Sequence, residues 1–322
     1  MNKKDQPSVI VTRKVPILVE NKLKKHFRVK LNESDKKFSP SDLKEALRKA
    51  DGLLCTVSDQ LSSDIISTAS KKTKIISNIG VGVSNISLNA AQKEQITVTN
   101  TPDVLTDATA DVALFLILAV SRRTSYLEAK LRRNEWSGFS IVEDLGVSLK
   151  GKTLGIIGMG RIGKATAIRA QKALGMEIMF YNRSKISGLD FVAYQAATLD
   201  ELLKESDVVS INAPGGAPQP IIKEADLLKM KPSAYLVNTA RGDVIDQNAL
   251  IKALTNKTIA GAGLDVFDNE PNVPRELIAL ENVTLLPHIG SATIETREAM
   301  GMLAVENLIA FFSNKLIPNR VI

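Results

Sequence analysis

The chain has 322 residues, 44% of them hydrophobic and 24% charged, which is enough for two globular domains with their own cores. Its one cysteine, Cys55, excludes a disulfide framework and a cysteine metal cluster; its apolar neighbours predict a core position, and we expect no metal site. The formal charge of +7 comes from dispersed lysines without a nucleic-acid motif, so a solvated surface is expected and no nucleic-acid partner. The N-terminus lacks an apolar signal core, and no stretch is apolar over the ~20 residues of a membrane helix, which predicts a cytoplasmic protein.

In chain order, residues 1–100 alternate short apolar strands with helical patterns. One helix start is well marked by Ser39, Pro40 and Asp42, a cap, a proline at the first helical position and an acid in the first turn. A second alternating series runs over 154–286. Two doubly wound α/β units are therefore predicted. The first-series strands are expected over 9–12, 28–31, 52–55, 74–79 and 97–100.

A long helical pattern over 107–135 lies between the two series. Its first half is apolar on nearly every side, and a helix of that kind must be buried. The burial could occur inside one domain or at a subunit interface.

Residues 153–163 form an apolar strand that runs into a glycine-rich turn, with an amphipathic helix over 161–174 after it. Gly158 permits the tight exit from the strand, Gly160 permits close approach of a pyrophosphate, and Gly163 lets the helix pack on the strand. The helix N-terminus offers unpaired N–H groups to the phosphates. This pattern predicts a dinucleotide-binding turn. The predicted cofactor contacts are Gly158, Gly160, Arg161, Ile162 and Gly163.

The next strand indicates which dinucleotide is bound. It ends in Asn182, Arg183 and Ser184, where NAD-binding chains carry an acid for the ribose 2′-hydroxyl. A guanidinium beside neutral donors suits a 2′-phosphate, so we predict NADPH (NADP+) as the cofactor. The alternative is a polar turn that happens to contain an arginine.

Three polar residues of complementary type follow three strands of the second series: Arg241, Glu270 and His288. Because the carboxyl ends of parallel strands share one edge, these residues should converge beside the dinucleotide. Arg241 could grip a carboxylate, His288 could donate a proton, and Glu270 could favour the imidazolium. The other histidine, His26, lies in a basic segment that reads as a solvated helix end. Each of the three residues, taken singly, could instead be an ordinary surface-loop residue.

Four segments, 158–163, 238–246, 263–271 and 287–293, together resemble the D-2-hydroxy acid dehydrogenase family over essentially the whole chain. The resemblance implies a Rossmann-type nucleotide domain, 101–288, inserted in a flavodoxin-like substrate domain, 1–100 with 289–322. It implies an active site in the cleft between the domains. Arg241 would bind substrate, Glu270 would support the acid/base, and His288 would be the acid/base.

The resemblance also implies ligand contacts. Backbone N–H groups of Val81 and Gly82 would bind the substrate carboxylate, unless this is merely a glycine-rich strand end, and Leu54 is a candidate pocket residue. Trp136 resembles an aromatic residue that reaches the neighbouring subunit's site, with core packing as the alternative. Further cofactor contacts are expected at Thr109, Ala213, Pro214, Thr239, Ala240, Asp265, His288 and Gly290.

Asn182, Arg183 and Ser184 resemble the NADPH-dependent glyoxylate/hydroxypyruvate reductase branch of this family. The sequence therefore predicts a homodimeric reductase of small 2-oxo acids, converting glyoxylate to glycolate and hydroxypyruvate to D-glycerate. Two alternatives remain, a dehydrogenase for a bulkier 2-oxo acid and a dinucleotide-sensing transcriptional corepressor. Formate oxidation is disfavoured, because formate dehydrogenases of this fold carry glutamine where Glu270 stands.

Overall fold

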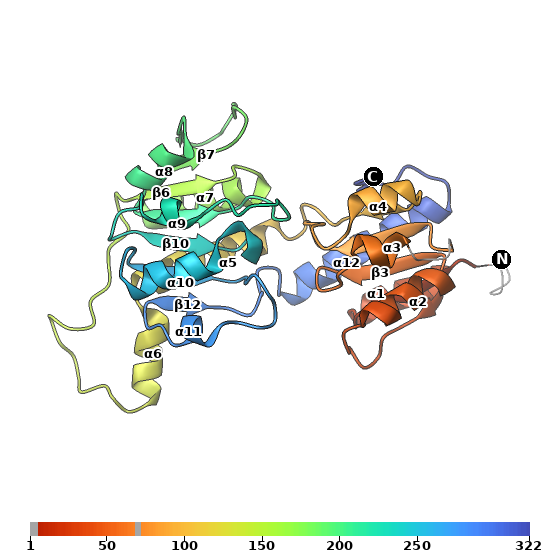
Figure 1. Ribbon diagram of the computed structural model, residues 1–322, viewed down its shortest axis with the longest axis horizontal. Coiled ribbons are helices and arrows are strands. Elements are labelled where there is room, and N and C mark those ends of the chain that lie inside the picture. Colours follow the sequence, from red (N-terminus) through yellow and green to blue (C-terminus); the bar gives the residue numbers. More distant parts are fainter. Residues whose placement is uncertain (1–5, 68–71) are drawn as a thin grey trace. The chain divides into compact units, whose positions relative to one another are not determined.

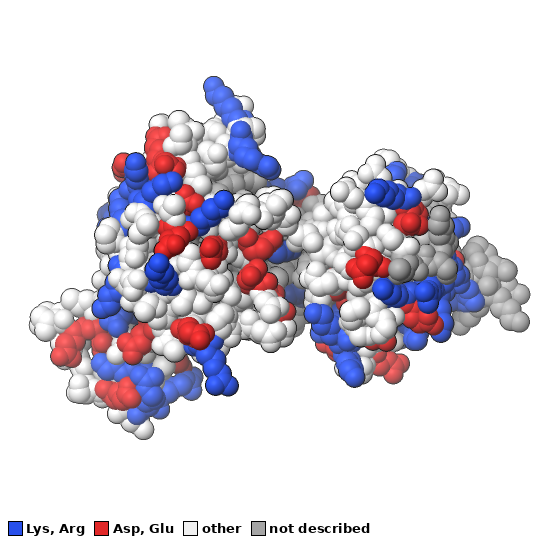
Figure 2. Space-filling model, in the orientation of Figure 1, with Lys and Arg blue, Asp and Glu red and all other residues white. Residues whose placement is uncertain are grey.

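The computed structural model describes residues 6–67 and 72–322, which form two compact α/β units (Figure 1). One unit comprises Met1–Leu105 and Ser291–Ile322, and the other comprises Thr106–Gly290. Within the described ranges, no helix combines the length and apolar character needed to cross a membrane. On the face drawn in Figure 2, basic and acidic side chains are interspersed rather than gathered by sign.

The first unit is built on a five-stranded parallel sheet in the order β2-β1-β3-β4-β5. This is the flavodoxin-like strand order. Successive strands are added on one side of β1 and then, from β3 onward, on its other side, so the topology switches between β1 and β3. Cys55 is fully buried in β3, as predicted. The strands are β1 (Ser8–Val11), β2 (Arg28–Lys30), β3 (Gly52–Thr56), β4 (Ile75–Ile79) and β5 (Thr97–Thr99).

Helices cover both faces of this sheet. α1 (Ile17–His26) packs against α12 (Ile294–Phe312), and α12 also packs on β4. The C-terminal segment therefore belongs to the first unit. The opposite face carries a core cluster that includes buried side chains of three helices. These are α2 (Pro40–Lys49), which begins with the predicted capping box of Ser39 and Asp42, α3 (Ser63–Ser67) and α4 (Leu88–Lys93).

The second unit has a seven-stranded parallel sheet in the order β12-β11-β10-β9-β6-β7-β8. Winding reverses between β6 and β9, which makes their carboxyl ends the expected dinucleotide position. The prediction of two parallel α/β units is confirmed. The strands are β6 (Thr153–Ile157), β7 (Glu177–Tyr181), β8 (Tyr194–Gln195), β9 (Val208–Ile211), β10 (Tyr235–Asn238), β11 (Gly261–Leu264) and β12 (Val283–Leu285).

Helices also cover both faces of the second sheet. α5 (Thr106–Ser121) and α7 (Arg161–Leu174) pack together on one face, where Arg169 of α7 forms ion pairs with Asp107 and Asp111 of α5. The other face carries a separate core cluster. Its helices are α8 (Leu199–Glu205), α9 (Glu224–Leu227), α10 (Gln247–Thr255) and α11 (Arg275–Ile278), with a short 3₁₀ turn at Gly242–Val244.

The single helix predicted over 107–135 is wrong, because the structure breaks it into α5 and α6 (Thr124–Arg132). Arg123 adopts a left-handed conformation with φ of 54° at the break. The Val147 N–H donates to the Ser121 carbonyl at 2.8 Å, so a later segment caps the end of α5. The long periodic pattern thus ends through a tertiary contact.

Burial of the first half of this segment inside one domain, one of the two expected possibilities, is incomplete. Phe115 and Leu118 of α5 are 51% and 39% exposed. Figure 1 shows α6 and the segment 133–146 projecting from the rest of this unit. Trp136 is 60% exposed, which excludes core packing within the unit. The segment 133–146 carries four more exposed large apolar side chains, Phe139, Ile141, Val142 and Leu145.

Candidate active site

The glycine-rich turn joins β6 to α7 at the point where the winding of the sheet reverses. Gly158 has φ of 95°, and a Cβ there would lie 2.9 Å from the Asn212 carbonyl oxygen after β9. A Cβ at Gly163 would collide with the Gly158 carbonyl, whereas one at Gly160 would meet nothing within 4 Å. Gly158 and Gly163 thus allow close packing, and Gly160 leaves open space for a pyrophosphate.

Two buried polar atoms at the carboxyl ends of the neighbouring strands β9 and β10 have no protein partner among the described residues. The Thr239 side-chain oxygen, just after β10, is buried and has no hydrogen-bond partner among the described residues. The same holds for Asn212 Oδ1, next to Ala213 and Pro214. Buried polar atoms are rarely left unpaired in a native protein, and a bound ligand would satisfy them. These residues therefore fit a dinucleotide cofactor.

Asn182, Arg183 and Ser184 form a turn directly after β7. The Asn182 amide donates to the Ser184 carbonyl and hydroxyl at 3.2 and 3.1 Å, which fixes the turn. Arg183 is exposed and has no acidic partner in the part of the chain that the structure describes. Its charge is therefore available to an anionic ligand.

Glu270 and His288 form the hydrogen bond that the sequence pattern anticipates, with 2.7 Å between Glu270 Oε2 and His288 Nδ1. The second oxygen, Oε1, accepts the Phe267 N–H at 3.0 Å, which orients the carboxylate. Burial by itself raises the pKa of Glu270. The hydrogen bond and charge of His288, the Phe267 N–H and the Arg241 charge outweigh burial and hold that pKa below its usual range. Glu270 is therefore a carboxylate at neutral pH, and Nε2 of His288 makes no hydrogen bond to the described residues.

Asp265 holds the loop that carries His288. It follows β11 directly, is 1% exposed, and accepts the N–H groups of Ile289 and Gly290, each at 2.7 Å. His288 itself adopts a left-handed conformation with φ of 56°. Burial raises the pKa of Asp265, although the two N–H groups and the His288 charge act in the opposite direction. A Cβ at Gly290 would lie 3.1 Å from Asp265 and 3.4 Å from Thr109, so Thr109 of α5 adjoins this loop.

Arg241 follows β10, the neighbour of β11 in the sheet, and lies close enough to Glu270 for their charges to interact. Burial lowers the pKa of Arg241, and the charges of Glu270 and Asp243 act against that shift. Its Nη1 donates to the Ala240 carbonyl at 2.7 Å. The second unit thus brings Arg241, Glu270 and His288 together along one edge of adjacent strands.

Two residues that the sequence analysis did not single out support Arg241. Asn238 donates to the Arg241 carbonyl at 2.7 Å and accepts the Ala240 N–H at 3.0 Å, which closes the turn after β10. Asp243 accepts the Gly216 N–H at 2.5 Å and so ties the loop after Pro214 to this turn. The role of Asn238 could have been inferred from the sequence, because asparagine at the end of a predicted strand often closes a turn with its side chain.

The substrate loop predicted at Val81 and Gly82 lies in the first unit, after β4. A Cβ added to the preceding Gly80, which has φ of 159°, would meet Val57 Cγ1 at 2.5 Å, so Val57 lies against the loop. Leu54 is only 1% exposed within β3, where it pairs with Val11 and Ser77. That burial argues against Leu54 as a direct substrate contact.

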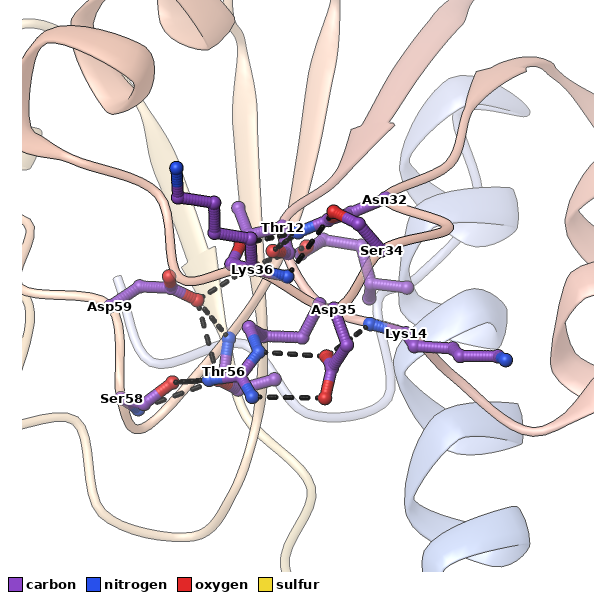
Figure 3. Close-up of polar contacts among 11 residues, drawn as sticks. Thr12, Lys14, Asn32, Ser34, Asp35, Lys36, Thr56, Ser58 and Asp59 are labelled. Atoms are coloured by element: carbon purple, nitrogen blue, oxygen red, sulfur yellow. Dashed lines mark hydrogen bonds and ion pairs between the residues drawn. The ribbon is translucent and has the colours of Figure 1, made fainter. Parts of the chain in front are cut away.

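A polar network joins the carboxyl ends of β1 and β3 (Figure 3). Asp59 is fully buried, and its Oδ2 accepts the Thr12 hydroxyl at 2.6 Å and the Thr56 N–H at 2.9 Å. Asn85 donates to the Thr56 and Asp59 carbonyls at 3.1 and 3.0 Å. The loop after β3 is therefore tied to the segment that follows Gly82.

Comparisons with known proteins agree with this geometry. Residues 114–290 match the family described as D-isomer specific 2-hydroxyacid dehydrogenase, NAD binding domain. The chain is 45% identical over 322 residues to a glyoxylate reductase of Thermococcus litoralis, covering 98% of this chain and 97% of that protein.

Solved structures with the same fold include two informative relatives. A putative D-isomer specific 2-hydroxyacid dehydrogenase from Polaromonas sp. JS6 66 is 36% identical, with a TM-score of 0.90 and coverage of 98% of this chain and 100% of that one. The NADPH-dependent glyoxylate/hydroxypyruvate reductase of Sinorhizobium meliloti, solved with NADP and malonate, is 35% identical, with a TM-score of 0.87 and coverage of 98% and 97%.

Proposed function

This chain belongs to the D-isomer specific 2-hydroxyacid dehydrogenase family, and we propose that it reduces glyoxylate to glycolate and hydroxypyruvate to D-glycerate with NADPH. The observation that carries the proposal is the 2.7 Å contact between Glu270 and His288, beside Arg241 on the neighbouring strand end. Reduction of a 2-oxo acid requires a proton donor for the forming hydroxyl and a cation for the substrate carboxylate. His288, supported by Glu270, and Arg241 are suited to these two tasks.

Each unit has a proposed role. We assign the second unit, Thr106–Gly290, to the cofactor and to catalysis, and the first unit to the substrate. Arg241 binds the substrate carboxylate through its guanidinium fork, and Val81 and Gly82 bind it through their N–H groups. These contacts orient the substrate carbonyl for reaction.

NADPH held at the turn of Gly158, Gly160 and Gly163 would supply the hydride that reduces the carbonyl carbon of the substrate. As the carbon–oxygen π bond breaks, His288 donates the proton from Nε2 to the carbonyl oxygen, which becomes the hydroxyl of the product. The Glu270 carboxylate stabilises the imidazolium before the transfer and holds the ring through Nδ1. The neutral imidazole then recovers a proton from solvent.

The choice of NADPH rests on Arg183 and Ser184. A guanidinium with no acidic partner among the described residues can pair with a 2′-phosphate, and residues 182–184, directly after β7, include no carboxylate to repel it. The NADP-bound Sinorhizobium meliloti relative supports the same choice.

We also propose that the protein is a homodimer. Large apolar side chains of α5, α6 and 133–146 are exposed in the single chain, and exposed apolar residues that form a patch mark interaction sites. Trp136 lies on this projecting segment, from which it could reach a second subunit. Sedimentation of the wild type and of a variant with Phe139 and Val142 changed to serine tests this, and a monomeric wild type would disprove it.

The function is tested by following NADPH oxidation with glyoxylate, hydroxypyruvate, pyruvate and a branched 2-oxo acid, and by repeating the best reaction with NADH. We expect the highest kcat/KM with glyoxylate or hydroxypyruvate. Preference for the branched acid would identify a dehydrogenase for bulkier substrates. Absence of turnover with all four acids, together with capture of a peptide partner, would favour a dinucleotide-sensing corepressor.

A further inference from the structure

The loop Gly80–Val81–Gly82 has every one of its carbonyl oxygens bound by the first unit. The Gly80 carbonyl accepts the Thr101 N–H at 3.0 Å. The Val81 carbonyl accepts Asn100 Nδ2 at 2.8 Å, and the Gly82 carbonyl accepts Asn78 Nδ2 at 3.0 Å. Two of the three donors are side-chain amides.

These carbonyl contacts determine where the following N–H groups point. In a trans peptide the C=O of one residue and the N–H of the next lie in one plane and point in opposite directions. The peptides of this loop are trans. The Val81 and Gly82 N–H groups, and that of Val83, therefore point away from Thr101, Asn100 and Asn78, and none of them has an acceptor among the described residues.

We infer that Asn100 is a positioning residue for substrate binding, because it turns the Gly82 N–H, one of the two donors proposed for the substrate carboxylate, outward. Asn78 holds the next peptide of the same loop. This inference rests on the proposed function. Asn100 fixes the Val81–Gly82 peptide, and Asn78 fixes the Gly82–Val83 peptide.

Both amides are held in the required orientation. Asn78 is fully buried, and its Oδ1 accepts Asn85 Nδ2 at 3.4 Å, which leaves its own NH₂ to face the Gly82 carbonyl. The main chain of Asn100 is fixed by Asn307, whose amide donates to the Asn100 carbonyl at 3.0 Å. Asn307 is itself fully buried in α12. The C-terminal helix thus supports the loop.

The test compares Asn100→Ala and Asn100→Asp with a matched control, Asn282→Ala. Asn282 is a suitable control because its side-chain amide likewise donates to main-chain carbonyls, those of Leu254 and Ala260. It directly precedes β12, at the amino end of that strand in the other sheet. We expect Asn100→Ala to raise KM for glyoxylate about 10-fold or more, as loss of a hydrogen bond to a charged group implies. The fall in kcat should stay within about threefold, and NADPH affinity should not change.

Asn100→Asp should raise KM further, because a carboxylate cannot donate to the Val81 carbonyl and adds an anion beside a bound anion. The inference is overturned if Asn100→Ala leaves KM within about twofold of wild type, or if Asn282→Ala raises it equally. A crystal structure of Asn100→Ala in which the Val81 carbonyl keeps its direction would also overturn it, whatever the substrate. Failure of the wild type to reduce any 2-oxo acid would instead refute the proposed function.

Discussion

Replacing Glu270 with glutamine removes the negative charge beside His288 and keeps the shape of the side chain. Two unit charges about 4 Å apart attract by about 4 kcal/mol at an effective dielectric constant of about 20. The His288 and Glu270 side chains are 30% and 34% exposed, so solvent screens much of this attraction. The change in the activity profile should therefore be smaller than the unscreened attraction would give.

The direction follows from the lowered pKa of Glu270, to which its bond with His288 contributes. Because Glu270→Gln removes the charge that supports a cationic proton donor, the alkaline limb of kcat/KM for glyoxylate reduction should move to lower pH.

The assay is NADPH oxidation at limiting glyoxylate from about pH 5 to about pH 10, for wild type and Glu270→Gln. Glu276→Gln is the matched control, because it removes an equal charge from an exposed position of α11 in the same unit. An alkaline limb that stays in place or moves upward in Glu270→Gln would refute the assigned role. If Glu276→Gln shifted the limb equally, the effect would come from the overall net charge of the protein and not from the contact with His288.

Four further substitutions separate the roles of the other site residues. His288→Ala should lower kcat by about 100- to 10,000-fold with NADPH affinity near wild type, and retention of more than about a tenth of turnover at neutral pH would contradict its role as acid. Arg241→Ala should mainly raise KM for glyoxylate, with a smaller fall in kcat; steady-state kinetics with an unchanged KM would speak against carboxylate binding. Arg183→Ala should weaken NADPH binding about 10- to 100-fold and leave NADH nearly untouched, and fluorescence titrations in which both weaken alike would exclude a 2′-phosphate contact. Asp265→Asn keeps one acceptor for two N–H groups, so urea unfolding should show a loss of about 1 to 3 kcal/mol, and kcat should fall as His288 loses its support; unchanged values for both would contradict the positioning role.

Local sequence patterns were sufficient to predict an element and its ends where the residues that start and stop it lie within the same short segment. The helix predicted over 161–174 has the observed bounds of α7, because Gly158 and Gly160 shape its start and Gly175, with φ of 63°, ends it. The capping box at Ser39 and Asp42 formed for the same reason. The adjacency of Arg241, Glu270 and His288 followed from the parallel order of β10, β11 and β12.

Features that depend on distant segments could not be predicted in this way. Periodicity over 107–135 continues through Arg123, but Val147 binds the Ser121 carbonyl and the helix ends there. Leu54 was a candidate pocket residue because it was expected near the end of its strand. β3 continues to Thr56, and Leu54 is only 1% exposed within it.

The sequence by itself determined the fold class, the dinucleotide turn and the three chemically complementary residues, because glycine geometry, strand periodicity and residue type are local properties. Only the tertiary structure decided how the site is held: Asp265 binds the N–H groups of Ile289 and Gly290, and Asn100 and Asn78 bind the carbonyls of the substrate loop. The bonds of Asp265 and Asn100 join a side chain to main-chain groups of another segment, whereas Asn78 binds a carbonyl only four residues away. Such pairings depend on which segments the folded sheet brings together, and no spacing along the chain encodes them.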